Sequence, residues 1–142
     1  MTDAALQDLQ LEVEDALWQY DPVREALGAL RIEARPDGKV EIAGPVRSGS
    51  IKDGILETVR RLPGVVEVID RMLSDHELEL EIAKAIDADR SLKTLPPGSV
   101  SVYGHLGQVS LVGKVPNEAL RRRVVEVAQA VPGVRRLVDR LG

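Results

Sequence analysis

The sequence has no cysteine and no phenylalanine, and it has only one tryptophan and two tyrosines among its 142 residues. The lack of cysteine excludes disulfides, thiolate nucleophiles and cysteine-based zinc or iron–sulfur sites. Because aromatic residues are so scarce, the core must be built from valine, leucine, isoleucine and alanine. The same scarcity leaves few aromatic platforms on which nucleic-acid bases could stack.

Long apolar runs are also missing, because no stretch approaches the roughly 18 apolar residues of a membrane-spanning helix. The first ten residues, MTDAALQDLQ, lack the basic start and the apolar segment of a secretory signal. We therefore expect a cytoplasmic protein, with the cell envelope or periplasm as the alternative if a leader has been removed. The composition, 44% hydrophobic and 30% charged, is typical of a globular chain.

The net charge of −4 is unevenly distributed. Residues 1–75 contain nine basic and fifteen acidic side chains, whereas residues 76–142 contain ten basic and eight acidic ones. This asymmetry either is ordinary scatter or indicates that the two halves differ in function. The acidic net charge argues against a nucleic-acid partner.

The chain contains an internal repeat. LPGVVEVIDRM begins at Leu62 and VPGVRRLVDRL begins at Val131, so the two segments stand 69 residues apart. The same offset of 69 aligns residues 38–72 of the first copy with residues 107–141 of the second without a gap. Upstream, LEVEDAL at Leu11 and LELEIAK at Leu78 stand 67 residues apart, which predicts a two-residue insertion in the second copy. A repeat of this length indicates two copies of one supersecondary unit.

Apolar periodicity and turn residues predict the element order α-β-β-α-β in each copy. The expected elements of the first copy are a helix over residues 3–20, a hairpin turning at 35–39, a helix over 48–62 and a strand over 65–73. Those of the second copy are a helix over 77–86, strands near 100–102 and 109–111, a helix over 117–131 and a strand over 134–141. Asp3, Ser48 and Asn117 are the expected helix N-caps.

We therefore predict an α+β fold made of two tandem units, residues 1–75 and 76–142, joined by a short linker at residues 74–76. Each unit should be a three-stranded mixed sheet with two helices on one face. The helix between the second and third strands is a crossover, so these two strands should run parallel.

The pattern G-x-V-x-[LI]-x-G-x-V, followed by a capped helix and P-G-V-x-x-V-x-[ND]-x-L, resembles the BON domain of bacterial osmotic-stress and nodulation-related proteins. The resemblance covers nearly the whole chain as a tandem pair. In the first copy the matching residues are Gly38, Val40, Ile42, Gly44, Val46, Pro63, Gly64, Val65, Val68, Asp70 and Met72. In the second copy they are Gly107, Val109, Leu111, Gly113, Val115, Pro132, Gly133, Val134, Leu137, Asp139 and Leu141.

The resemblance implies a non-catalytic module without a cofactor. Family members are mostly envelope proteins thought to bind phospholipid surfaces, and others are cytoplasmic modules that bind ligands or ions. We expect this chain to engage anionic phospholipid or envelope surfaces in a stress-related role. The alternative is a cytoplasmic adaptor or a small-ligand or cation sensor that acts through protein contacts, with a partner on the open face or edges of its sheets or with a second copy through sheet edges.

Arginines of the second copy are the main candidates for contact with anionic lipid. Arg121, Arg122 and Arg123 lie on the crossover helix, and Arg135 and Arg136 begin the last strand. Basic residues near an anionic membrane attract it. The competing interpretation is a solvated helix face on which Glu126 pairs with Arg122 or Arg123.

Trp18 is a further candidate, because an amphipathic aromatic ring can enter a bilayer interface. Packing in the core is the favoured interpretation for a lone tryptophan.

The repeated residues have structural explanations. Gly44 and Gly113 end strands where a bulge or turn needs glycine, although they could also allow a ligand close to the backbone. Pro63-Gly64 and Pro132-Gly133 end the crossover helices. Asp70 and Asp139 stand where the family often has Asn, and we expect their carboxylates to accept backbone N–H groups.

Other site classes find little support. With two histidines and no nucleophile or phosphate-binding motif, we expect no enzymatic activity. His76 and the acids after it do not converge on one helix face, so we expect no metal site. Residues 104–107 match the GxxG clamp of RNA-binding KH domains, but strand alternation on both sides indicates a hairpin turn.

Overall fold

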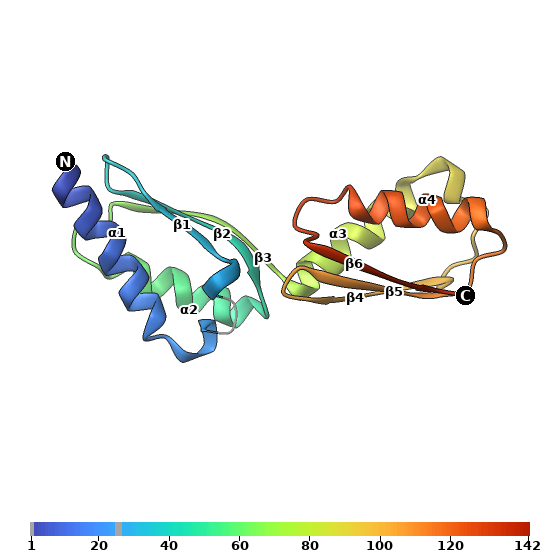
Figure 1. Ribbon diagram of the computed structural model, residues 1–142, viewed down its shortest axis with the longest axis horizontal. Helices are drawn as coiled ribbons and strands as arrows, with labels where there is room; N and C mark the ends of the chain where they lie inside the picture. Colours follow the sequence, from blue (N-terminus) through green and yellow to red (C-terminus); the bar gives the residue numbers. More distant parts are fainter. Residues whose placement is uncertain (1, 25–26) are drawn as a thin grey trace. The chain divides into compact units, whose positions relative to one another are not determined.

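The structure, a computed structural model, describes residues 2–24 and 27–142 and divides the chain into two units (Figure 1). The units are Met1–Ser74 and Asp75–Gly142, so the division falls one residue before the expected one. Each unit is a three-stranded sheet with two helices on one of its faces. The predicted α+β fold of two tandem α-β-β-α-β units is confirmed.

The first unit follows the predicted element order. Its elements are α1 (Asp3–Trp18), the 3₁₀ turns η1 (Asp21–Val23) and η2 (Leu27–Ala29), β1 (Arg31–Ala34), β2 (Lys39–Val46), α2 (Gly49–Arg60) and β3 (Glu67–Ser74). Strand β2 is central, pairs antiparallel with β1 and pairs parallel with β3. The crossover through α2 therefore gives the parallel pair that was expected.

The second unit repeats this topology. Its elements are α3 (Asp75–Ala88), the 3₁₀ turn η3 (Arg90–Leu92), β4 (Val100–His105), β5 (Gln108–Gly113), α4 (Glu118–Gln129) and β6 (Arg136–Leu141). Strand β5 is central, antiparallel to β4 and parallel to β6. The GxxG segment is a hairpin turn between β4 and β5, as predicted, with positive φ at Leu106 and Gly107.

The linker predicted at residues 74–76 does not exist. Ser74 pairs with Val46 as the last residue of β3, and α3 begins at the next residue, Asp75. The carboxylate of Asp75 accepts a hydrogen bond from the backbone N–H of Leu106, which ties the start of α3 to the second unit.

Two of the three predicted helix caps are confirmed. Ser48 accepts a hydrogen bond from the N–H of Ile51 at 3.2 Å, and Asn117 accepts one from the N–H of Leu120 at 2.9 Å. The prediction for α1 is wrong, because the cap is Thr2 and not Asp3. Thr2 has the extended backbone that an N-cap requires, and its hydroxyl accepts from the N–H of Ala5.

The predicted two-residue insertion between the first helices is wrong. The buried positions of α1 and α3 coincide at the general offset of 69, since Leu9 matches Leu78 and Val13 matches Ile82. The register shifts instead at the first strands, where Ala34 pairs with Val40 and Gly104 pairs with Val109. The second copy therefore has one extra residue before its first strand, and the first copy has one extra residue in its hairpin.

The core of each unit lies between the helices and one face of the sheet, and it is aliphatic as predicted. In the first unit the side chains with no exposed surface are Val13, Leu17, Val23, Val40, Ile42, Val46, Ile55 and Val59. In the second unit they are Ile82, Val109, Leu111, Val124 and Ala128.

Gly44 and Gly113 occupy equivalent positions near or at the end of the central strands. Their φ angles are 130° and 148°, which L side chains rarely adopt. A Cβ on Gly44 would lie 2.6 Å from the carbonyl oxygen of Ala29, and a Cβ on Gly113 would lie 1.9 Å from that of Ser99. The close approach is to the protein's own backbone, which accounts for both glycines structurally.

Candidate functional site: the open faces of the two sheets

Within the described residues, the helices of each unit cover only one face of its own sheet. Because successive side chains of a strand point to opposite faces, the outward residues follow from the buried ones. The first open face consists of Arg31, Glu33, Arg35, Lys39, Glu41, Ala43, Pro45, Glu67, Ile69, Arg71 and Leu73. The second open face consists of Ser101, Tyr103, His105, Gln108, Ser110, Val112, Arg136, Val138 and Arg140.

The first open face is organised around the carboxylate of Glu41. The Nε of Arg71 donates to it at 2.7 Å, and guanidinium nitrogens of Arg35 and Arg31 lie 3.3 Å and 3.6 Å from its oxygens. The three arginines cover Glu41 so completely that its side chain is only 8% exposed. The charges of Glu41 and its three arginines are therefore already paired.

The second open face has no such centre. Ser110 stands where the first unit has Glu41, and none of the nine outward residues of this fully described face is acidic. Arg136 and Arg140 form no ion pair with any residue that the structure describes. Val112 of the central strand β5 pairs with Arg140, and Tyr103, which is 59% exposed, lies on β4 across β5 from the arginines. The face therefore combines uncompensated positive charge with an exposed aromatic ring.

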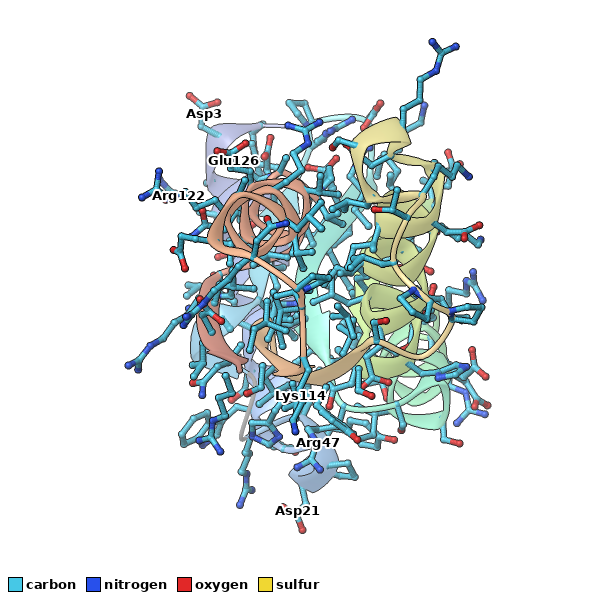
Figure 2. The ribbon with its side chains drawn as sticks, turned by 90° about the vertical axis from the view of Figure 1, so that its right-hand side faces the viewer. Asp3, Asp21, Arg47, Lys114, Arg122 and Glu126 are labelled. Atoms are coloured by element: carbon cyan, nitrogen blue, oxygen red, sulfur yellow. The ribbon has the colours of Figure 1, made fainter. Side chains whose placement is uncertain are left out.

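The three consecutive arginines of α4 are each paired with carboxylates. Arg121 contacts Asp139 at 2.9 Å, Arg122 lies 3.7 Å from Glu118, and Arg123 contacts Asp89 and Glu126. Figure 2 shows Arg122 projecting away from α4. Four acids thus surround three arginines, and this helix face has no excess of positive charge.

Arg135 differs from its neighbour Arg136. Its aliphatic stem packs over the hairpin turn, so a Cβ on Gly107 would lie 2.7 Å from it. The backbone N–H of Arg135 donates to the carbonyl of Gly107 at 2.8 Å. Arg135 is exposed, but it precedes β6 and is not one of the strand residues that point outward on the second open face.

The contact between Asp89 and Arg123 joins η3 to α4. A hydrogen bond from Arg123, helped by those from the hydroxyl and backbone N–H of Ser91, lowers the pKa of Asp89 from 3.8 to about 2. Arg123 is 46% exposed, so water screens the interaction from its side, whereas the Asp89 side chain is largely covered. Hydrogen bonds from the Leu141 N–H and from Arg121 also lower the pKa of Asp139.

These shifts predict an acid-sensitive contribution to stability. A carboxylate whose pKa is lower in the folded state stabilises the fold above its unfolded pKa, near 3.8, and this stabilisation is lost as the pH falls toward about 2. Urea unfolding followed by circular dichroism between pH 5 and pH 2 should therefore show a shallower pH dependence for Asp89→Asn than for the wild type. Arg123→Gln should flatten the profile similarly, and the double variant should add nothing further.

Asp70 and Asp139 form the same network in both units. Each carboxylate accepts the backbone N–H two residues later, from Met72 or Leu141, at 2.9 Å. Each also faces a cation of the crossover helix, with Lys52 at 3.6 Å from Asp70. Each network therefore occupies one backbone N–H group on the outer edge of its strand, that of Met72 in β3 and that of Leu141 in β6.

Side chains of the first helices occupy the opposite sheet edges. The amide of Gln10 donates to the carbonyl of Ile32 and accepts from the N–H of Ala34, at 2.7 and 2.6 Å. In the second unit the carboxylate of Glu79 accepts from the N–H of Gly104 at 2.8 Å. These contacts leave fewer backbone groups for pairing with a strand of another chain.

Trp18 is not packed in the core. Its side chain is 57% exposed, and the guanidinium of Arg24 lies 5.7 Å from the ring centroid. The packing interpretation was wrong because position 18 lies on the outer side of α1, away from Leu9, Val13 and Leu17. Trp18 shares that side with Leu11, which is 63% exposed.

Acidic residues flank these two apolar side chains. Leu11, Trp18 and the neighbouring Asp8, Glu14 and Asp15 are three, four or seven residues apart and therefore share one face of α1; we refer to this set as the α1 stripe. Helix α1 carries five carboxylates and no cation. None of the five forms an ion pair within the described part of the chain.

Two features bear on other site classes. Within the described residues, no three His, Asp or Glu side chains gather as a metal site would require, and His76 lies 3.9 Å from Glu79 at the surface. In the same part of the chain, no helix is long and apolar enough to cross a membrane.

Sequence reasoning missed the contrast between the open faces. It selected Arg136 but not Arg140, Tyr103 or Glu41. The signal was present, because the offset of 69 places Glu41 opposite Ser110 in the alignment of the two copies.

Comparisons with known proteins agree with the repeat. The model of the family described as BON domain matches the chain twice, over residues 8–73 and 74–141. No curated protein matches the chain.

Solved structures similar to this chain include two of CdsD, described as a structural protein of the type III secretion system of Chlamydia trachomatis. The first is 15% identical and has a TM-score of 0.38, and the match covers 86% of this chain and 90% of that one. The second, a C-terminal domain, is also 15% identical and has a TM-score of 0.37, with 85% and 94% covered. The two family matches together span nearly the whole chain, which therefore belongs to the BON domain family as a tandem pair of such domains.

Proposed function

We propose that this chain is a non-catalytic binding module that engages anionic phospholipid surfaces through the second open face. A stress-related role would follow from the family resemblance alone. The observation that carries the proposal is the pairing state of the arginines. Arg136 and Arg140 have no carboxylate among the outward residues of their own sheet face, whereas Arg121, Arg122 and Arg123 are already neutralised by ion pairs.

The chemistry of the second open face suits a membrane surface better than the helix face does. Each cation close to an anionic bilayer contributes about 1 kcal/mol of attraction. An exposed tyrosine such as Tyr103 has an apolar ring and a polar hydroxyl, a combination found at the level of lipid headgroups. The attraction should weaken with salt, because ions screen exposed charges.

Co-sedimentation with vesicles tests the proposal. Wild-type protein should sediment with anionic vesicles at low salt, less so at high salt, and not with neutral vesicles. Arg136→Ser combined with Arg140→Ser should weaken binding about 30-fold, since two cations contribute about 2 kcal/mol.

The control is the change of Arg121, Arg122 and Arg123 to Ser, which removes more positive charge from the chain but from a paired surface. This triple variant should keep most of the binding. Loss of binding in the triple variant, with full binding by the double variant, would move the lipid site to α4 and contradict the proposal.

A second candidate function, an adaptor acting through protein contacts, is favoured by the α1 stripe. Two large apolar side chains beside unpaired carboxylates suit a protein partner with a basic rim. Such a stripe would be repelled by an anionic membrane.

A further inference from the structure

Two surfaces in the described part of the chain are complementary in charge and composition. The α1 stripe is apolar with an acidic border, formed by Leu11 and Trp18 beside Asp8, Glu14 and Asp15. The second open face has exposed Tyr103 and Val112 beside Arg136 and Arg140. Each surface carries charge that no described residue of the chain neutralises.

We infer that the α1 stripe of one copy docks on the second open face of another copy. Leu11 and Trp18 would then be covered by Tyr103 and Val112, and the carboxylates would meet the arginines at the rim. An apolar centre with a charged rim is the usual arrangement of a protein interface. This inference shares the second open face with the proposed function and otherwise does not depend on phospholipid binding.

The contact joins two different surfaces and is therefore heterologous. A heterologous contact leaves one free stripe and one free face at the ends of every assembly, so growth continues past the dimer unless a ring closes. It also covers the surface proposed to meet phospholipid. Self-association and vesicle binding should consequently compete, so that the assembled protein is a masked form of the binding module.

Sedimentation velocity of the full chain tests the contact. The average mass of the wild type should rise with protein concentration beyond the dimer at low salt and fall when salt is added. A first variant, Leu11→Ser with Trp18→Ser, has no stripe but keeps its open face. A second variant, Arg136→Ser with Arg140→Ser, keeps its stripe but has a disabled face. Each variant alone should stay monomeric, and circular dichroism checks that both are folded.

Mixing the two variants gives the decisive result. The intact face of the first variant can bind the intact stripe of the second, and no further docking is possible, so the mixture should form a 1:1 heterodimer and nothing larger. A wild type that stays monomeric at every concentration, or a mixture that stays monomeric, would overturn the inference.

The failure of this inference can be told apart from failure of the proposed function. Vesicle binding is measured at protein concentrations below those that cause association. The first variant, which cannot self-associate, should bind anionic vesicles as well as the wild type at these concentrations and better at higher ones. Weaker vesicle binding by this variant would contradict the masking, because it would place the stripe on the membrane side.

Discussion

Changing Gly113 to alanine should destabilise the protein by about 4 kcal/mol. Its φ of 148° lies in a region open essentially to glycine only and costs an L residue about 1–3 kcal/mol, and the new Cβ would lie 1.9 Å from the carbonyl oxygen of Ser99. The obstacle is backbone rather than a flexible side chain, so the strands must separate, which adds about 1–3 kcal/mol. Urea unfolding monitored by circular dichroism measures the loss.

Gly98 provides a matched control. Its φ of 82° is also positive, but a Cβ there would meet nothing within 4 Å. Gly98→Ala should therefore cost only the conformational part, about 1 kcal/mol. Equal losses for the two variants would show that the close approach to Ser99 is unimportant and would contradict the structural explanation of the repeated glycine.

Replacing Glu41 by alanine should lower the free energy of unfolding by about 2 kcal/mol. The change leaves Arg31, Arg35 and Arg71 facing one another without the carboxylate that holds them. A hydrogen bond to a charged group contributes about 1.5–3 kcal/mol, and the lower part of that range applies because the three guanidinium groups are 39–71% exposed and water screens them. Fluorescence of Trp18, the only tryptophan of the chain, follows the unfolding of the first unit specifically.

Glu33 is the control for Glu41. It pairs with Glu41 across β1 and β2 and lies on the same open face, but it is exposed and forms no ion pair with a described residue. Glu33→Ala should change stability by less than about 0.5 kcal/mol. If both variants behaved alike, the three-arginine cluster would contribute nothing beyond general charge.

The fold was largely predictable because each element has a strong local signal. Helix periodicity, the Ser48 and Asn117 caps and the two Pro-Gly pairs do not depend on distant contacts. The mistakes lie at the ends of elements. Thr2 rather than Asp3 caps α1, and no linker separates β3 from α3, because these boundaries depend on single hydrogen bonds.

The candidate site was less predictable because it depends on partners far apart in sequence. Arg123 pairs with Asp89 from 34 residues away, and Arg121 pairs with Asp139 from 18 residues away. A run of three arginines therefore looked like a basic patch until the carboxylates around it were located. Arg136 and Arg140, which form no ion pair with a described residue, stand four residues apart in an alternating strand, so only Arg136, beside Arg135, stood out in the sequence.

The central claim is that the second open face, and not the first, meets anionic membranes. Because the chain has no cysteine, a single introduced cysteine can carry an environment-sensitive fluorophore at a unique site. Val112 and Ala43 occupy equivalent positions on the two open faces. Val112→Cys and Ala43→Cys therefore form a matched pair, studied at concentrations below self-association.

On addition of anionic vesicles at low salt, the label at position 112 should shift its emission to the blue, and the shift should reverse at high salt. The label at position 43 should not respond. A response at position 43 alone, or none at position 112 while the protein sediments with the vesicles, would contradict this account.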